Sequence, residues 1–170
     1  WDLISSGNTK GVFQLESRLG QTTSKKLKPR NIEHLSALTA IIRPGCLNAR
    51  IDNKSVTDHY IDRKNGEEAV EYFQPALRPI LKPTYGQMIY QESAMKIATD
   101  IAGFNLQEAD TLRKSIGKKD AALMAKVKVQ FLKGCATVAT VTKEQAEEIF
   151  GWIESSQRYS FNHSHSVSYA

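Results

Sequence analysis

Cysteine is scarce in this sequence, and its scarcity limits the class of protein. The chain of 170 residues has two cysteines, Cys46 and Cys135, which lie far apart and form no C-x-x-C pair. A disulfide-stabilised secreted scaffold is therefore not expected, and a reducing, cytoplasmic setting is favoured. Apolar runs are also short. None approaches the roughly 20 residues that span a bilayer, so we expect no membrane partner.

Sequence motifs of catalysis are missing as well. The sequence has no D-x-D pair, no G-x-S-x-G nucleophile motif and no Walker-type glycine loop. Asp58 and Asp62 are spaced to share one helix face, but His59, Arg63 and Lys64 surround them, as is typical of a solvated face. Two-metal phosphoryl transfer needs carboxylates that hold both ions. The sequence therefore predicts no metal site, no bound cofactor and no catalytic residue of its own.

Helical periodicity is what the sequence does contain, and it predicts a mainly α fold with short irregular or β segments near the N-terminus. Residues 11–15 fit either a strand or a tight helical turn, and residues 157–168 have the composition of a loop. Glycines at 66, 103, 117 and 134 are expected to end helices. The predicted helices cover 32–42, 56–64, 88–102, 105–117, 120–132 and a segment that opens with the capping box at 142–145.

Prolines predict a boundary inside the chain. A loop-rich stretch contains prolines at 75, 79 and 83, so we expect a mixed helix-and-loop part over 1–83 and a helical part over 84–170. Pro44 and Gly45 predict a sharp turn directly after the helix at 32–42.

Basic charge is concentrated in one stretch of the sequence. Residues 113–133 carry a net charge of +6, above the +5 of the entire chain, because only Asp120 opposes the basic residues there. Positive charge beside the predicted helix break at Gly117 suits phosphate, which cations neutralise and free backbone N–H groups bind. A solvated basic helix face is the alternative. The basic residues are Arg113, Lys114, Lys118, Lys119, Lys126, Lys128 and Lys133.

The segment 159–166 is the second candidate site. His163 and His165, together with Asn162, could bind a phosphate, a base or a metal, although two histidines are too few for a zinc site. Tyr159 could stack on a base, whereas Phe161 is favoured as a core anchor.

Arg43 is an isolated candidate. It follows an apolar helix and precedes Pro44, and a fixed turn can aim a guanidinium at a carboxylate or a phosphate. An ordinary surface arginine is the equally open alternative.

Several blocks of the sequence, taken in order, resemble the bacterial DNA polymerase III alpha subunits, the C-family replicative polymerases. Each block is short, but together they keep the family's order and spacing over nearly the whole chain. The blocks are Gly11–Ser17, Ile42–Gly45, Tyr60–Lys64, Pro83–Gly86 with Tyr90–Glu92, Ala102–Phe104 with Glu108–Asp110, Leu112–Arg113 with Gly117–Lys119, and Phe161–His165 with Tyr169–Ala170.

The resemblance implies that this chain is the fingers domain of a DNA-directed DNA polymerase, a nucleotidyltransferase of DNA replication. The chain starts at Trp1 without a methionine, and we expect it to be a piece of a longer polymerase. The catalytic Mg²⁺ is expected at a palm domain outside this chain, so the chain alone is expected to be inactive. The implied partners are dNTP, primer-template DNA, the rest of the polymerase and replisome subunits such as the sliding clamp and clamp loader. The implied location is the cytoplasm, at the nucleoid.

The resemblance also implies which residues face the nucleotide. The tract that is similar to L-R-R-x-M-G-K-K should face the triphosphate, with Arg113 foremost and Lys114, Lys118 and Lys119 in support. The blocks that are similar to those lining the nucleotide and template side contain Arg43, Lys64, Asn162, His163 and His165.

The sequence departs from the family pattern at particular positions. Cys46 replaces the second proline of R-P-G-P, Lys114 replaces an arginine, Ser160 replaces a glycine and His163 replaces a lysine. Because histidine is mostly neutral at pH 7, we expect the contact at 163 to be weaker or pH-dependent. These departures suggest a distant relative such as a phage or plasmid copy. A non-catalytic nucleic-acid-binding or protein-docking helical module remains the alternative to a polymerase domain.

Overall fold

The computed structural model describes residues 1–117 and 120–170, and its described part is built almost entirely of helices. This confirms the predicted mainly α fold. The α-helices are α1 (Asp2–Ser5), α2 (Arg18–Leu27), α3 (Ile32–Ile41), α4 (Pro44–Asn48), α5 (Val56–Asn65), α6 (Arg78–Leu81), α7 (Gln91–Ala102), α8 (Leu106–Gly117), α9 (Ala121–Val138), α10 (Lys143–Ser156) and α11 (His163–Ser168). Short 3-10 helices cover Pro75–Leu77 and Lys82–Thr84, and β1 (Arg50–Ile51) pairs antiparallel with β2 (Lys54–Ser55).

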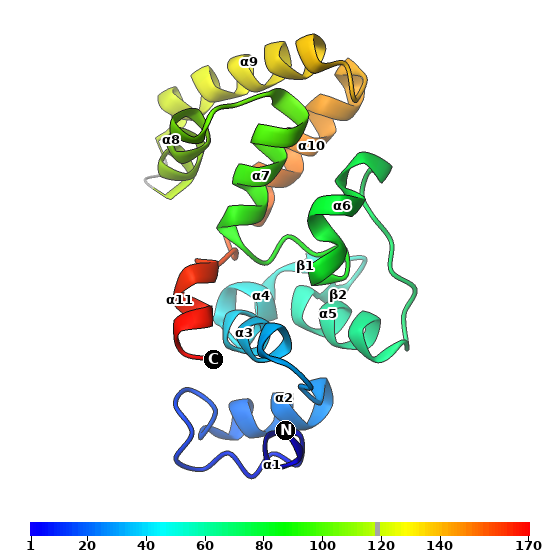
Figure 1. Ribbon diagram of the computed structural model, residues 1–170, viewed down its shortest axis with the longest axis vertical. Helices are drawn as coiled ribbons and strands as arrows, with labels where there is room; N and C mark the ends of the chain where they lie inside the picture. Colours follow the sequence, from blue (N-terminus) through cyan, green and yellow to red (C-terminus); the bar gives the residue numbers. More distant parts are fainter. Residues whose placement is uncertain (118–119) are drawn as a thin grey trace.

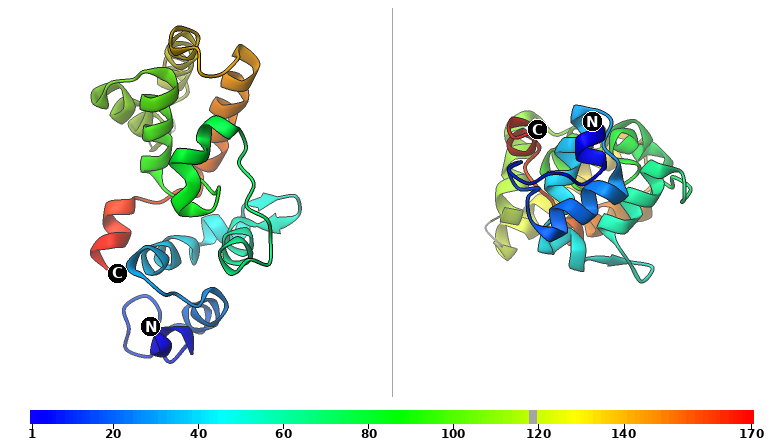
Figure 2. Two further views of the ribbon diagram at one scale, coloured as in Figure 1. Left: turned by 45° about the vertical axis from the view of Figure 1, so that its right-hand side comes forward. Right: turned by 90° about the horizontal axis from the view of Figure 1, so that it is seen from below.

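The helices follow one another along an elongated molecule (Figure 1). The N-terminal helices α1 and α2 lie at one end, α3 to α5 with the β-hairpin lie in the middle, and α7 to α10 form the other end. The chain then returns, because α11 packs against α3 and brings the C-terminus back to the middle of the molecule (Figures 1 and 2). Among the described residues, no helix has both the length and the apolar character needed to cross a membrane.

Two hydrophobic clusters hold these parts together. The first cluster lies between α2, α3, α4 and α5 and also contains Ile89 and Tyr90. The second cluster lies between α6, α7, α8, α9 and α10 and is centred on Phe131, Phe150 and Ile97. Tyr159 and Phe161 return to the first cluster after α10 has packed in the second. The predicted division into 1–83 and 84–170 stays a prediction, since residues 89–90 and 159–161 pack with the earlier part of the chain.

Helix ends follow the local sequence rules. The side chains of Asn31, Ser55 and Asp120 each accept a hydrogen bond from the backbone N–H three residues later, as N-caps do. Gly66 and Gly103 end α5 and α7 with φ of 80° and 68°, the left-handed conformation that glycine adopts without cost. The predicted capping box of Thr142 and Gln145 is present at the start of α10.

The predicted end of α9 at Gly134 is wrong. The helix continues to Val138, and Gly134 lies inside it where α9 crosses the end of α7. A Cβ atom at Gly134 would stand 2.0 Å from the carbonyl oxygen of Ala102. The glycine is therefore needed for the close approach of two helices.

Three further local predictions also need correction. Helix α7 begins at Gln91, not at Met88, because Tyr90 forms a backbone bridge with Phe161 and leaves the preceding residues extended. Residues 163–168, expected as a loop, form α11 because the Asn162 side chain caps their first turn. Pro44 starts the short helix α4 instead of a sharp turn. Residues 11–15 form turns and bends, so the strand alternative for them is excluded.

We expect Gly134→Ala to lower the free energy of unfolding by about 1–3 kcal/mol, since the added methyl group overpacks the crossing with α7. Gly151→Ala is the matched control. Gly151 also lies inside a helix, but a Cβ atom there would have nothing within 4 Å, so alanine should stabilise α10 by about 1 kcal/mol. Urea unfolding followed by circular dichroism measures both. Equal effects of the two substitutions would contradict the proposed crossing.

Candidate functional site

The basic tract at the end of α8 is organised by one acid. Arg113 donates from Nε and Nη2 to Oδ1 of Asp110 at 2.9 and 2.7 Å, and Lys114 Nζ lies 2.6 Å from Oδ2 of the same carboxylate. Hydrogen bonds from Lys114 and Arg113 lower the pKa of Asp110 from its ordinary value, so this acid stays ionised. Two cations thus share one anion, and the group keeps a net positive charge. Lys118 and Lys119, predicted to support Arg113, lie outside the described residues.

A second group of predicted residues gathers around the end of α3. The guanidinium of Arg43 lies 4.0 Å from the ring centroid of Phe161, a cation–π contact. Arg43 Nε is buried and has no hydrogen-bond partner in the described part of the chain. The structure therefore brings Arg43 together with the 161–165 segment, which is far from it in sequence.

The predicted residues of the 161–165 segment are held largely by contacts of their own. Asn162 Oδ1 accepts from the backbone N–H of His165 at 2.8 Å, which makes Asn162 the N-cap of α11. The backbone N–H of His163 donates to Glu92 Oε2 at 2.9 Å, and the ring of His163 lies over Tyr90 with centroids 4.1 Å apart. The exposed ring of His165 stands edge-on to Phe161 and Tyr169. Asn162 and Phe161 are thus part of the framework, and His165 presents its ring at the surface.

The α8 group and the 161–165 segment lie on the same side of the molecule. Figures 1 and 2 place α8 and α11 on one side of the molecule. A hollow of about 600 Å³ lies beside the end of α8, lined by Ser115 and Ile116, by the start of α9, and by Gln157 and Arg158 after α10. The structure thus brings the predicted phosphate-binding tract and the second candidate segment to one face.

The ammonium group of Lys64 is bound to the protein's own backbone. Its ammonium donates to the carbonyl oxygens of Leu27 and Lys28 at 2.7 and 2.8 Å, and to the side chain of Asn65 at 3.2 Å. These carbonyls are at the C-terminal end of α2, where helix carbonyls lack partners within the helix. Burial lowers the pKa of Lys64, and repulsion from Arg30 and Lys28 adds to this. The geometry therefore favours a role for Lys64 in joining α5 to α2.

Tyr159 packs on the protein itself. It lies half-buried against the first cluster, and burial raises its pKa. A Cβ atom at Gly45 would come within 2.9 Å of the Tyr159 Cα, so α4 and Tyr159 approach as closely as a glycine allows. Cys46 is fully buried here, and its Sγ lies 3.6 Å from the Tyr159 carbonyl oxygen. Base stacking by Tyr159 stays a prediction.

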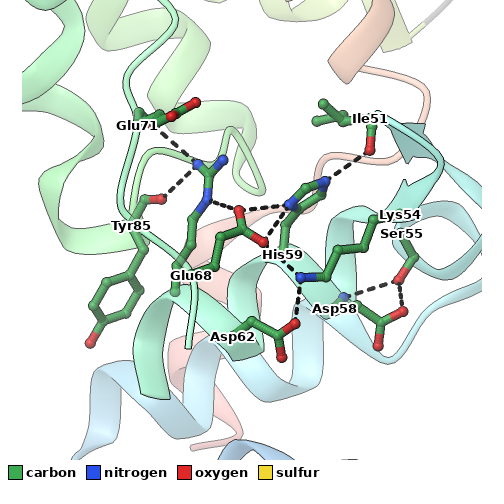
Figure 3. Close-up of polar contacts among 10 residues, drawn as sticks. Ile51, Lys54, Ser55, Asp58, His59, Asp62, Glu68, Glu71 and Tyr85 are labelled. Carbon is green, nitrogen blue, oxygen red and sulfur yellow. Dashed lines mark hydrogen bonds and ion pairs between the residues drawn. The ribbon is translucent and has the colours of Figure 1, made fainter. Parts of the chain in front are cut away.

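The expectation that Asp58, His59, Asp62 and Arg63 form a solvated face is wrong. Figure 3 shows Glu68 at the centre of a network that includes His59 and Lys54, with Asp62 beside Lys54 and Asp58 bonded separately to Ser55. Glu68 accepts from Lys54 Nζ at 2.7 Å, from Arg63 Nε at 2.5 Å and from His59 Nδ1 at 2.8 Å. Lys54 also pairs with Asp62, and Asp58 accepts from Ser55 at 2.6 Å. We refer to Lys54, His59, Asp62, Arg63 and Glu68 as the Glu68 network.

Hydrogen bonds surround both His59 and Glu68 in this network. His59 Nε2 lies 2.8 Å from the Ile51 carbonyl oxygen while Nδ1 faces the Glu68 carboxylate, so both ring nitrogens face acceptors. Burial alone would raise the pKa of Glu68, but hydrogen bonds from Lys54, Arg63 and His59 hold it at about 2. No local sequence pattern indicates this network, because Glu68 lies beyond the Gly66 cap and meets α5 only after the chain turns.

We expect Glu68→Gln to destabilise the chain at neutral pH and to weaken its response to acid. The folded-state pKa of Glu68, about 2, lies below the ordinary value of 4.5, so its stabilisation is present above that value and is lost as pH falls from 4.5 toward 2. The difference in free energy of unfolding between wild type and Glu68→Gln should therefore vanish over this pH range. Urea unfolding at a series of pH values measures this difference. Glu67→Gln, at an exposed neighbour, is the control and should unfold like the wild type. A free-energy difference that stays constant with pH would show that the charge of Glu68 does not stabilise the chain.

We expect Lys64→Met to lower the free energy of unfolding by about 1–3 kcal/mol, because the carbonyls at the end of α2 lose a charged donor. Lys10→Met, at an exposed position, is the matched control. If both variants unfold at the same urea concentration, Lys64 does not join the two helices.

Comparison with known proteins identifies the family of the chain. The family model of the bacterial DNA polymerase III alpha subunit finger domain matches residues 1–138. The DNA polymerase III subunit alpha of Aquifex aeolicus is 46% identical over 169 residues, which is 99% of this chain and 14% of that protein. The corresponding subunits of Thermus aquaticus and Helicobacter pylori are 41% and 40% identical over 100% and 98% of this chain, and 14% and 13% of their own length.

These matches cover the chain from end to end, and the chain spans about a seventh of the length of these relatives. The resemblance noted from short sequence blocks is confirmed. The chain therefore belongs to the family of bacterial DNA polymerase III alpha subunits, and its residues 1–138 match their finger domain.

Proposed function

We propose that this chain binds the incoming dNTP and the primer-template as the fingers of a DNA-directed DNA polymerase. The observation that carries the proposal is the Asp110 group, in which one carboxylate holds Arg113 and Lys114 in place at the end of α8. Charge developing on a transferring phosphoryl group is stabilised best by cations that are already positioned. Arg113, whose planar guanidinium suits bidentate contact with phosphate, is the principal candidate, with Lys114, Lys118 and Lys119 in support.

The second group would meet the nucleotide or template from the side of α11. Arg43 keeps an unpaired Nε on its aromatic support, and His163 and His165 follow the Asn162 cap on the same face. A hollow of about 600 Å³ next to the end of α8 is bordered by α8, α9 and the end of α10. Its size suits a ligand such as a nucleotide.

Catalytic metal chemistry would be supplied by another part of the polymerase. Carboxylates of the Asp110 group and the Glu68 network are committed to cations of this chain itself. We therefore propose that Mg²⁺ is bound at a palm domain and that these 170 residues alone do not incorporate nucleotides. Template-dependent incorporation by this chain alone would disprove that division.

The remainder of the polymerase is the proposed docking partner. Phe13 and Tyr169 stack on each other with ring centroids 4.6 Å apart, although both are more than half exposed. An exposed aromatic pair favours contact with another protein surface. This observation also supports the alternative of a protein-docking module, and a palm with a D-x-D motif in the same gene would decide for the polymerase. The sliding clamp and the clamp loader are further proposed partners. The proposed location is the cytoplasm, at the nucleoid.

In the polymerase that carries this chain, we expect Arg113→Ala to raise the KM for dNTP by about 10–100-fold, since a charge-assisted hydrogen bond contributes about 1.5–3 kcal/mol. Steady-state primer extension at varied dNTP concentration measures this effect. Arg18→Ala, at an exposed arginine of α2 at the far end of the molecule, is the control and should leave the KM unchanged. An unchanged KM for Arg113→Ala would reject the assignment of this residue.

A further inference from the structure

A hollow lies between α4, the β-hairpin and the end of α10. Its volume is about 510 Å³, which is within the usual range for sites that bind one small molecule or one nucleotide. Its lining joins residues between 44 and 51 to Trp152 and Ser155 of α10 and to Arg158 and Tyr159 beyond that helix. Among the described residues that line it, none is an aspartate or a glutamate.

Two arginines give this hollow a positive charge. Arg50 and Arg158 both line it, and both are exposed to solvent. Within the described part of the chain, neither guanidinium forms an ion pair, and Glu154, the acid nearest to Arg158 in sequence, makes none with it. A cleft lined by charge of one sign attracts the opposite charge, and a planar guanidinium suits phosphate oxygens.

The neighbouring hollow on the other side of Trp152 does not share this charge. Asp52 and Glu71 line it, and its arginine, Arg63, is already bound to Glu68. An anion is therefore expected between α4 and the end of α10, and not in the neighbouring hollow.

Trp152 supplies an aromatic wall. Its ring stacks on Phe73 with centroids 5.0 Å apart, so the ring is held in place before any ligand binds. Phe73 lines the neighbouring hollow and not this one, so the part of half-buried Trp152 that borders this hollow is left uncovered by Phe73. Aromatic rings beside cations are the combination that binds single-stranded nucleic acid, since bases stack on the rings and phosphates meet the cations.

The position of Arg158 connects this hollow to the α8 region. Arg158 also lines the hollow of about 600 Å³ beside the end of α8. A strand that extends from one hollow to the other would therefore pass its guanidinium. A paired base has both faces stacked and its edge occupied, so only an unpaired nucleotide can place its base against Trp152. An acidic peptide would meet the arginines but would leave the aromatic wall unused.

We propose that this hollow binds one unpaired nucleotide of single-stranded DNA, with Arg50 and Arg158 at its phosphates and Trp152 against its base. The identity of the strand rests on the proposed polymerase function, in which the template has unpaired nucleotides beyond the primer end. The contact is additional to the proposed grip on dNTP, because Arg50 and Trp152 do not belong to the Asp110 group.

The test measures binding of fluorescently labelled primer-template by the polymerase that carries this chain, with and without an unpaired template overhang. Arg50→Ala should weaken binding of the overhang substrate about fivefold or more and leave binding of the blunt duplex unchanged. It should also reduce the slope of log affinity against log salt by about 0.7, as expected for one phosphate contact on a single strand. Arg18→Ala, at an exposed arginine that does not line the hollow, is the control. Unchanged binding of the overhang substrate, or equal loss on both substrates, would overturn the proposal.

The contact with the base is tested with single abasic positions placed along the overhang. One such position should weaken wild-type binding about fivefold or more, and the same position should have no effect on Trp152→Leu. Trp152→Phe keeps an aromatic ring and should respond to the abasic position as the wild type does. If no abasic position weakens wild-type binding, the hollow does not hold a base and the proposal is wrong.

The KM for dNTP of Arg113→Ala separates this proposal from the proposed function. A raised KM, together with overhang binding that Arg50→Ala and Trp152→Leu leave intact, would reject the strand site and leave the proposed function standing. An unchanged KM, together with loss of overhang binding in these two variants, would support the strand site and reject the nucleotide assignment of Arg113.

Discussion

The candidate site depends on one short backbone pairing. Phe161 N–H donates to the Ile89 carbonyl at 2.8 Å, and Gln91 N–H donates to the Phe161 carbonyl at 2.9 Å. This pairing draws the segment after α10 back from the second cluster to the first. It places Phe161 under the Arg43 guanidinium and His163 over Tyr90. Without it, residues 43, 90 and 161–165 would have no reason to share a face, because no helix contains more than a part of them.

Positioned charge is the common theme of the polar residues. Asp110 holds Arg113 and Lys114, Glu68 holds Lys54 and Arg63, and the carbonyls of α2 hold Lys64. Each arrangement fixes long side chains that would otherwise lose rotamer entropy on binding a ligand. The arrangements differ, however, in how much positive charge is left unpaired. The Asp110 group has two cations for one anion at the surface, whereas the cations of the Glu68 network already meet Glu68 and Asp62. This difference is why the α8 tract is the better candidate for phosphate.

The sequence predicts most helices here because their caps and periodicity are local. Asp120, Thr142 and Gly66 act within a few residues of the ends that they set. The errors have nonlocal causes. Gly134 resembles a helix stop but serves a crossing with Ala102, and Met88 has helical spacing but precedes a bridge to residue 161. The charge run at 113–114 could be found by counting. The Glu68 network could not, because its acid lies beyond a helix end and meets the basic residues only after the chain turns.

A structure of the polymerase that carries this chain, bound to primer-template and a non-hydrolysable dNTP, tests the central claim most directly. We predict that the Arg113 guanidinium lies within about 3 Å of a phosphate oxygen of the nucleotide while it keeps its contact with Asp110. A triphosphate bound elsewhere, with Arg113 in contact with Asp110 alone, would contradict the account.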